Sequence, residues 1–335
     1  EEPLPQYKRS NCRGLRLLCV QHILHQPGYY GKPPPCTGRL VTSNDFCNYR
    51  IHCLGLDEDL SMQRKHILRV AAIQLSSLGD KGQNTAKAVE LIDTASEYGA
   101  RLVILPEMFN CYSTLSEMVE KAEPVPGPTI NTLAQKARSN NIYILCGSII
   151  ETAIKGKGFN TSVMIGPRGD ILGIYRKIHL FDVDIPERVH YKESERILPG
   201  NEIVVVNVDG WVVGLAICYD LRFPELFCAL TSKGAELVLI PSAFAAHTGK
   251  DHWEILLRAR AIENQVFIVA PNRFGACPNN MATYGRSMVV DPWGTILSQA
   301  SDKVCVILSE LDISILEEVR ENIPMKRQKI VTTAQ

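Results

Sequence analysis

Hydrophobic and polar positions divide the chain into a short first part without a regular pattern and a long second part with one. Over about the first 65 residues, apolar positions follow no sustained period of two or of 3.6. From residue 68 onward, short apolar runs alternate with stretches in which apolar residues recur every three or four positions. We therefore expect an ordered domain over residues 67–329, with a leader over 1–66 and a tail over 330–335.

Apolar runs in the ordered part predict strands, and the amphipathic stretches predict helices. The first helix is expected to begin at a cap residue, Asn84, and to end at Gly99. Several strands are apolar on both faces, which is typical of a sheet covered on both sides, so the pattern predicts an α/β layered protein. Further helices are expected at about 130–138, 224–232, 252–263 and 313–321. Strands are expected at 70–73, 102–105, 142–145, 161–165, 171–175, 203–206, 212–217, 237–240, 266–270, 286–290, 296–297 and 304–311.

Two segments of the ordered part, 99–107 and 234–242, resemble each other, and we call this similarity the echo and the two segments the echo segments. Each begins with a glycine that can stop a helix, continues as a short apolar strand and reaches a proline, which cannot continue a strand ladder. If the echo reflects two halves built alike, two sheets pack face to face with helices outside. The alternative is a chance similarity between two strand–helix units that share the same turn residues.

Composition and charge narrow the class of protein. The chain has 335 residues, of which 45% are hydrophobic, as in globular proteins of one large or two ordinary domains. Its formal net charge is zero, which argues against binding to nucleic acid or to a membrane surface, since both need a basic excess. No apolar run approaches the ~18 residues of a membrane-spanning helix, so none is expected.

The leader differs from the rest in charge as well as in pattern. Between Pro3 and Asn44 it has no acidic residue, and an acid-free basic leader is one form of organellar transit peptide. A disordered tail or a gene-model extension is the alternative, with Met62 as the start of the functional chain. We expect a cytoplasmic protein, or one of mitochondria or another organelle if the leader is genuine. The basic residues are Lys8, Arg9, Arg13, Arg16, Lys32 and Arg39.

Cysteine is frequent, with eleven residues, five of them within the first 53 positions. No two are spaced as CxxC, and no cysteine pair faces a histidine pair at zinc-finger spacing, so no metal site is expected. An odd number in a chain of this length does not indicate a disulfide framework. Besides a metal site and a disulfide framework, the third possible role of a cysteine is that of a catalytic thiol, and this role remains open.

Three polar residues follow apolar strands directly, at the strand ends where ligand crevices of α/β proteins lie. They are Glu107, Lys177 and Cys218. Each alone also fits an ordinary role: a turn glutamate, a charge beside a strand and a small buried hydrophobe. Together they would supply a base, a cation for an oxyanion and a nucleophile. Spacing along the chain does not show that they converge.

The sequence around these three residues closely resembles the three catalytic blocks of the nitrilase superfamily of carbon–nitrogen hydrolases. The resemblance covers about residues 68–329 and continues through several shorter segments. The blocks are Leu105-Pro106-Glu107-Met108-Phe109, Tyr175-Arg176-Lys177-Ile178-His179-Leu180-Phe181-Asp182 and Gly214-Leu215-Ala216-Ile217-Cys218-Tyr219-Asp220-Leu221-Arg222-Phe223-Pro224-Glu225.

This resemblance implies a four-layer α-β-β-α sandwich that is usually dimeric. It implies that Cys218 is the nucleophile, Glu107 the general base and Lys177 the stabiliser of the tetrahedral species. A second, supporting glutamate is expected at Glu193, with Glu195 as the alternative. No cofactor or metal is implied. The expected partners are an amide substrate, water and a second copy in a homodimer or larger homo-oligomer.

The segment after Cys218 looks like that of the amidase branches, because true nitrilases usually carry a Trp-Glu pair there. The similar branches are ω-amidase (2-oxoglutaramate amidase) and deaminated glutathione amidase, which both act on ω-amides of 2-oxo acids. Such a substrate needs cationic or N–H donors for its carboxylate. Arg222 is instead expected to pair with a neighbouring acid, Asp220 or Glu225. The candidates for substrate binding are Tyr219, Phe244, Thr248 and Arg286.

The expected reaction forms a thioester on Cys218, releases ammonia and is completed by water. Lys177 and the N–H of Tyr219 are expected to meet the oxyanion. Two other functions remain open. One is a non-catalytic family member that acts as an interaction protein, although none of the three reactive residues is lost. The other is a thiol redox sensor in which Cys228 serves as the resolving cysteine.

Overall fold

The computed structural model describes residues 66–154, 156–185, 189–277 and 282–325. All described residues belong to one compact unit within the range Glu58–Gln335. The predicted leader (apart from residue 66), the start at Met62 and the tail over 330–335 lie outside the described residues, so these stay predictions.

The ordered unit alternates strands and helices, as the apolar pattern predicts. Its α-helices are α1 (Lys81–Glu97), α2 (Leu115–Glu120), α3 (Pro128–Asn140), α4 (Pro224–Ser232), α5 (Ala246–Asn264) and α6 (Ile313–Asn322), with 3-10 turns η1 (Glu193–Glu195) and η2 (Cys218–Arg222). Its strands are β1 (Ile67–Gln74), β2 (Leu102–Ile104), β3 (Tyr143–Leu145), β4 (Ile149–Thr152), β5 (Gly158–Ile165), β6 (Ile171–Arg176), β7 (Asp182–Ile185), β8 (Val189–Lys192), β9 (Ile197–Leu198), β10 (Val205–Val208), β11 (Trp211–Leu215), β12 (Leu237–Leu239), β13 (Phe267–Ala270), β14 (Phe274–Ala276), β15 (Ala282–Tyr284), β16 (Met288–Val290), β17 (Ile296–Gln299) and β18 (Cys305–Asp312).

Most strands form two sheets, one from the first half of the unit together with the last strand, β18, and one from the second half. The eight-stranded sheet runs β18-β1-β2-β3-β5-β4, with β6 and β9 also paired to β5, and the six-stranded sheet runs β10-β11-β12-β13-β16-β17. The two echo segments supply β2 and β12, each of which lies between two parallel neighbours. Their similarity is therefore that of equivalent strands in two sheets, as the two-half interpretation predicts.

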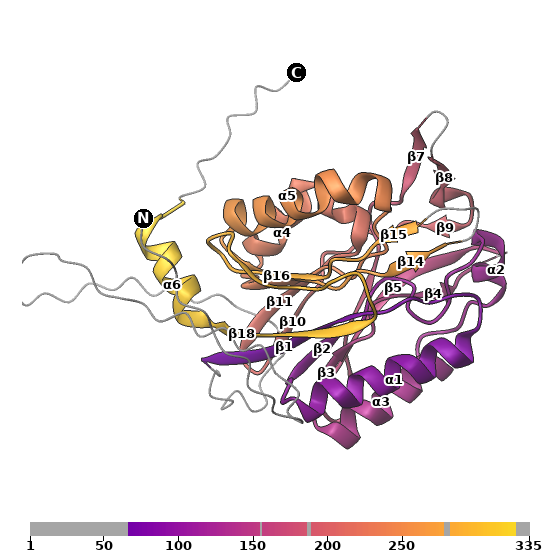
Figure 1. Cartoon of the computed structure of the whole chain (residues 1–335), viewed down its shortest axis with the longest axis horizontal. Helices are drawn as coiled ribbons and strands as arrows, with labels where there is room; N and C mark the ends of the chain where they lie inside the picture. The colour runs from indigo at the N-terminus through magenta and orange to yellow at the C-terminus, as the bar shows by residue number, and fades with distance from the viewer. Residues whose placement is uncertain (1–65, 155, 186–188, 278–281, 326–335) are drawn as a thin grey trace, which may run out of the picture. The chain divides into compact units, whose positions relative to one another are not determined.

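Alternation along β1 shows how the sheets are layered. Leu68 and Val70 belong to the core that also contains Val213 of the other sheet, whereas Ala71 and Ile73 pack with the buried faces of α1 and α3. Figure 1 shows α1 and α3 on the outer side of one sheet and α4 and α5 on the outer side of the other. The predicted α-β-β-α sandwich is thus confirmed.

The first helix begins earlier than predicted. Its N-cap is Asp80, whose carboxylate accepts a hydrogen bond from the N–H of Gln83 at 3.0 Å. Asn84 lies inside the helix and donates to the carbonyls of Leu78 and Asn110, so its amide joins two loops and caps nothing. The prediction was wrong because Asp80 caps the helix, while the amide of Asn84 binds the loop before the helix and the loop at Asn110.

Helix α5 also begins earlier than predicted, at Ala246 in place of residue 252. Its first turns carry His247, Thr248 and Gly249, which show no helical period of apolar residues. Gly249 packs so closely on Tyr284 that an added Cβ would lie 2.5 Å from that side chain. The first turns of α5 thus make a close tertiary contact, which a periodicity argument does not detect.

Candidate active site

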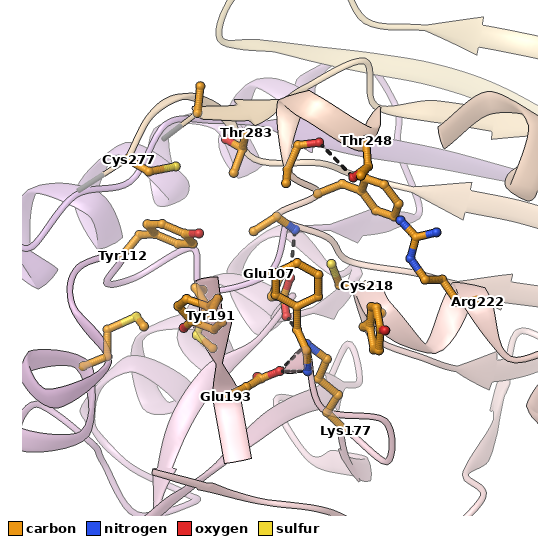
Figure 2. Close-up of a pocket in the computed structure, with 18 residues that line it drawn as sticks. Glu107, Tyr112, Lys177, Tyr191, Glu193, Cys218, Arg222, Thr248, Cys277 and Thr283 are labelled. Carbon is orange, nitrogen blue, oxygen red and sulfur yellow. Dashed lines mark hydrogen bonds and ion pairs between the residues drawn. The ribbon is translucent and has the colours of Figure 1, made fainter. Parts of the chain in front are cut away.

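Glu107, Lys177 and Cys218 meet in one pocket, as Figure 2 shows. They follow the ends of β2, β6 and β11, so both sheets contribute to the pocket. Glu193, the first residue of turn η1, completes the group, and all four side chains are buried. The structure therefore brings together the three residues that spacing alone could not place side by side.

Lys177 lies between two carboxylates. Its Nζ is 3.0 Å from Oε1 of Glu107 and 2.9 Å from Oε2 of Glu193. Burial alone would lower the pKa of Lys177, but the two carboxylates more than compensate and hold that pKa well above its usual value. The side chain stays a cation inside the protein. Glu195, the alternative to Glu193, is exposed.

Cys218 stands on a strained turn at the end of its strand. Its φ is +45°, in the left-handed region that costs a residue with a Cβ ~1 kcal/mol or more. Its N–H donates to the carbonyl of Pro241 at 3.0 Å. Burial raises the pKa of the thiol well above its usual value, and the charge of Glu107 adds to this while that of Lys177 opposes it. Cys218 therefore stays protonated until a base takes its proton.

Asn160 fixes both carboxylates and was missed from the sequence. This buried residue of β5 donates from Nδ2 to Oε1 of Glu107 at 2.9 Å and to Oε1 of Glu193 at 3.0 Å. The N–H of Ala243 donates to the other oxygen of Glu107 at 2.8 Å. Asn160 lies directly before the strand predicted over 161–165, but this position does not reveal its two partners, which are 53 and 33 residues away along the chain.

Three of the four predicted substrate-binding residues line the pocket, namely Tyr219, Phe244 and Thr248. Arg286 does not line it, and its guanidinium pairs with Asp302 at 2.7 Å. The pocket also has an aromatic and thiol-bearing wall that the sequence did not indicate. That wall includes Tyr112, Met118, Phe181, Tyr191, Cys277 and Thr283.

Arg222 also lines the pocket, contrary to its expected pairing with a neighbouring acid. Its guanidinium lies 5.1 Å from the ring centre of Phe244 and 5.8 Å from that of Tyr219, and it contacts Nδ1 of His252 at 3.3 Å. The carboxylate of Asp220 is occupied by other donors, described below. The expectation was wrong because Asp220 turns into the core while Arg222 turns into the pocket.

The chain is similar to known proteins in both sequence and fold. The family model of carbon–nitrogen hydrolases matches residues 69–321. The chain is a carbon–nitrogen hydrolase. Omega-amidase NIT2 of Homo sapiens is 38% identical over 261 residues, which are 78% of this chain and 94% of that protein. A deaminated glutathione amidase of Synechocystis sp. is 38% identical over 264 residues, which are 78% of this chain and 97% of that protein.

Solved structures of other carbon–nitrogen hydrolases share the fold. Nit3 of Saccharomyces cerevisiae, described as a member of branch 10 of the nitrilase superfamily, is 33% identical with a TM-score of 0.72, over 79% of this chain and 97% of that one. A variant amidase from Nesterenkonia sp. AN1 is 27% identical with a TM-score of 0.65, over 76% of this chain and 95% of that one. In that amidase the acetamide moiety of fluoroacetamide is covalently added to the active-site cysteine. The family and these relatives identify the present protein as a hydrolase that acts on amides.

Two further observations concern only the part of the chain that the structure describes. Among those residues, no group of three or more His, Cys, Asp or Glu side chains is arranged to hold a metal ion. No helix among them combines the length and the apolar character that crossing a membrane requires.

Proposed function

We propose that this carbon–nitrogen hydrolase is a thiol-dependent ω-amidase. It hydrolyses the terminal amide of a small carboxylate-bearing substrate of the 2-oxoglutaramate type to the acid and ammonia. The observation that carries the proposal is the buried group of Glu107, Lys177 and Cys218 in a pocket that also holds Arg222. One ligand in this pocket can therefore meet a nucleophile (Cys218), a base (Glu107) and a fixed cation (Lys177). Arg222 can bind its carboxylate.

In the first half of the reaction, Glu107 takes the proton of the Cys218 thiol as Sγ attacks the amide carbon. The carbonyl oxygen becomes an oxyanion. Lys177 uses two of its three N–H bonds on Glu107 and Glu193 and keeps the third for this oxygen, and the N–H of Tyr219 is the second donor. These fixed donors stabilise charge that develops only in the transition state.

In the second half, Glu107 passes its proton to the amide nitrogen and the C–N bond breaks. Ammonia leaves, and the acyl group remains on Cys218 as a thioester. Glu107 then takes a proton from water, whose oxygen attacks the thioester carbon. The C–S bond breaks, the proton returns to the sulfur, and the free acid leaves. Glu193 and Asn160 support this sequence by holding Lys177 and Glu107 in place.

The carboxylate of the substrate is assigned to Arg222 and Thr248. Among the described residues that line the pocket, one is a lysine, Lys177, and one is an arginine, Arg222. Lys177 is already engaged by two carboxylates. A half-buried guanidinium between two aromatic rings is a strong site for a carboxylate, since charge-assisted hydrogen bonds gain strength where water is excluded.

A deaminated glutathione amidase is the second candidate, and the extent of the pocket favours it. Figure 2 shows Arg222 and Thr248 on one side of Cys218, and Tyr112 and Cys277 on the other. If the acyl group lies toward Arg222, the opposite end can receive a leaving amine larger than ammonia. The same catalytic steps then release that amine.

The proposal is tested by measuring acid release from 2-oxoglutaramate, deaminated glutathione, asparagine and a simple nitrile. The wild-type chain should prefer 2-oxoglutaramate, and the quenched reaction should contain protein heavier by the acyl group on Cys218. Cys218→Ala should abolish both signals, while Cys228→Ala, at an exposed cysteine of α4, should retain them. Hydrolysis at the wild-type rate by folded Cys218→Ala, or reaction with the nitrile alone, would refute the proposal.

A further inference from the structure

We propose that Asp220 is a positioning residue that ties the loop carrying Lys177 to the turn carrying Cys218. Asp220 is fully buried two residues beyond Cys218. Its Oδ2 accepts from the hydroxyl of Tyr175 at 2.6 Å and from the N–H of Ile217 at 2.8 Å. Its Oδ1 accepts from the N–H of His179 at 3.0 Å and lies 2.7 Å from the ring Nδ1 of the same residue.

These donors bracket the reacting residues along the chain. Tyr175 precedes Lys177 by two residues and His179 follows it by two, so one carboxylate holds the segment on both sides of the lysine. Ile217 directly precedes Cys218. Because Tyr175 belongs to the eight-stranded sheet and Ile217 follows β11 of the six-stranded sheet, Asp220 joins the two sheets at the point where their catalytic residues meet.

The turn around Cys218 depends on the same residue through its backbone. The N–H of Asp220 donates to the carbonyl of Ile217 at 3.0 Å while its carboxylate accepts from the N–H of Ile217. This reciprocal pair closes the turn in which Cys218 adopts its left-handed backbone. Such a conformation persists only where the surrounding contacts fix it.

A second buried aspartate offers a matched comparison. Asp209 accepts from the hydroxyl of Tyr143 at 2.9 Å and pairs with Arg101 at 2.7 Å. Tyr143 lies in β3 of the eight-stranded sheet and Asp209 follows β10 of the six-stranded sheet, so this pair also joins the sheets. Neither Asp209 nor Tyr143 is one of the described residues that line the pocket.

The two tyrosines act alike as donors. Burial and the neighbouring aspartate raise the pKa of both Tyr175 and Tyr143, so both hydroxyls keep their protons. The pair at Asp209 therefore matches the pair at Asp220 in its tyrosine donor and in joining the sheets, but it lacks the catalytic neighbours and has a salt bridge to Arg101 in addition. A merely structural aspartate should behave like Asp209.

Asp220→Asn preserves shape but removes one acceptor. The new NH₂ group must face either the N–H of Ile217 or that of His179, and neither backbone donor can turn away. We expect kcat on 2-oxoglutaramate to fall by about 10- to 100-fold, the loss that a misplacement of ~1 Å can cause, with KM changed by less than about threefold. Asp209→Asn should lower the melting temperature and leave kcat within about twofold of wild type.

Equal kcat losses in the two folded variants, or an unchanged kcat in folded Asp220→Asn, would overturn the inference. If Asp220→Asn does not fold, Tyr175→Phe and Tyr143→Phe decide, because each removes only one hydroxyl from a buried aspartate. Tyr175→Phe should lower kcat by at least about threefold while Tyr143→Phe leaves it unchanged. The inference rests on the proposed roles of Lys177 and Cys218. Their failure would appear separately, as full activity of Cys218→Ala.

Discussion

The two echo strands, β2 and β12, share a backbone plan and contribute differently to the site. Each is the middle of three parallel strands in its own sheet, and each is followed by a proline, at positions 106 and 241. The proline of the first half leads into Glu107, which reaches the pocket. The proline of the second half leads into Ser242, which is fully buried and hydrogen-bonded to its own strand end, at the carbonyl of Ile240.

The second strand end contributes through its backbone. The carbonyl of Pro241 receives the N–H of Cys218 at 3.0 Å, and the N–H of Ala243 donates to Glu107 at 2.8 Å. In the proposed mechanism, the first half thus supplies the base and the cation, and the second supplies the nucleophile and two backbone contacts that help to hold the base and the nucleophile in place. Equivalent strand ends can therefore serve chemistry in one sheet and positioning in the other.

Replacing the residue after each proline should separate these two roles most strongly. Glu107→Gln keeps hydrogen-bonding capacity but cannot take the thiol proton, so we expect hydrolysis of 2-oxoglutaramate to fall by about 10³-fold. Ser242→Ala removes only the local hydrogen bond to Ile240 and should leave kcat within about threefold. Steady-state ammonia release by both purified variants measures the difference.

A comparable activity loss in the two variants would break the comparison, since it would mean that both strand ends act through their side chains. Melting temperatures serve as the control for folding. The activity loss in Glu107→Gln can be assigned to chemistry only when that variant unfolds within a few degrees of wild type. A destabilisation of ~1 kcal/mol shifts the melting temperature of a domain of this size by about 2–4 °C.

The second half should also control substrate affinity through Arg222. We expect Arg222→Gln to raise KM for 2-oxoglutaramate by about 10- to 100-fold, as the loss of a charge-assisted hydrogen bond of ~1.5–3 kcal/mol predicts, with a smaller effect on kcat. A neutral aliphatic amide should show no such change. Arg286→Gln is the matched control, because that guanidinium pairs with Asp302 outside the pocket.

If Arg286→Gln raised KM as much as Arg222→Gln, the carboxylate site would lie elsewhere. The same result for the neutral amide in Arg222→Gln would point to a general packing role for this side chain. Either outcome would shift substrate recognition away from the turn that follows Cys218.

Features carried by short contiguous segments could be predicted from the sequence. Helix α4 matches its predicted range, since proline opens it and a glycine stops it. Glu107, Lys177 and Cys218 could be singled out because each follows an apolar strand, and their expected roles came from the resemblance to the nitrilase superfamily. Asn160 and Arg222 could not be interpreted, because their partners lie far along the chain: Asn160 joins two carboxylates, and Arg222 is left to the pocket once Tyr175 and His179 occupy Asp220.

The smallest predicted effect concerns two glycines that share a positive φ but differ in surroundings. Gly147 follows β3 with φ +68°, and a Cβ there would lie 2.1 Å from the carbonyl oxygen of Pro106. Gly234, which precedes β12, has φ +88° and no atom within 4 Å of an added Cβ. Gly234→Ala should therefore cost only the ~1–2 kcal/mol of a left-handed alanine.

Gly147→Ala must in addition displace Pro106, which directly precedes Glu107. We expect it to lower the free energy of unfolding by about 1–3 kcal/mol more than Gly234→Ala does, and to lower kcat by a few fold. Urea unfolding and steady-state kinetics measure the two effects. Equal destabilisation, with kcat unchanged in both variants, would show that the first strand end tolerates movement. Glu107 would then be held from outside its own strand, by Asn160 of the same sheet and by Ala243, which follows β12 of the other sheet.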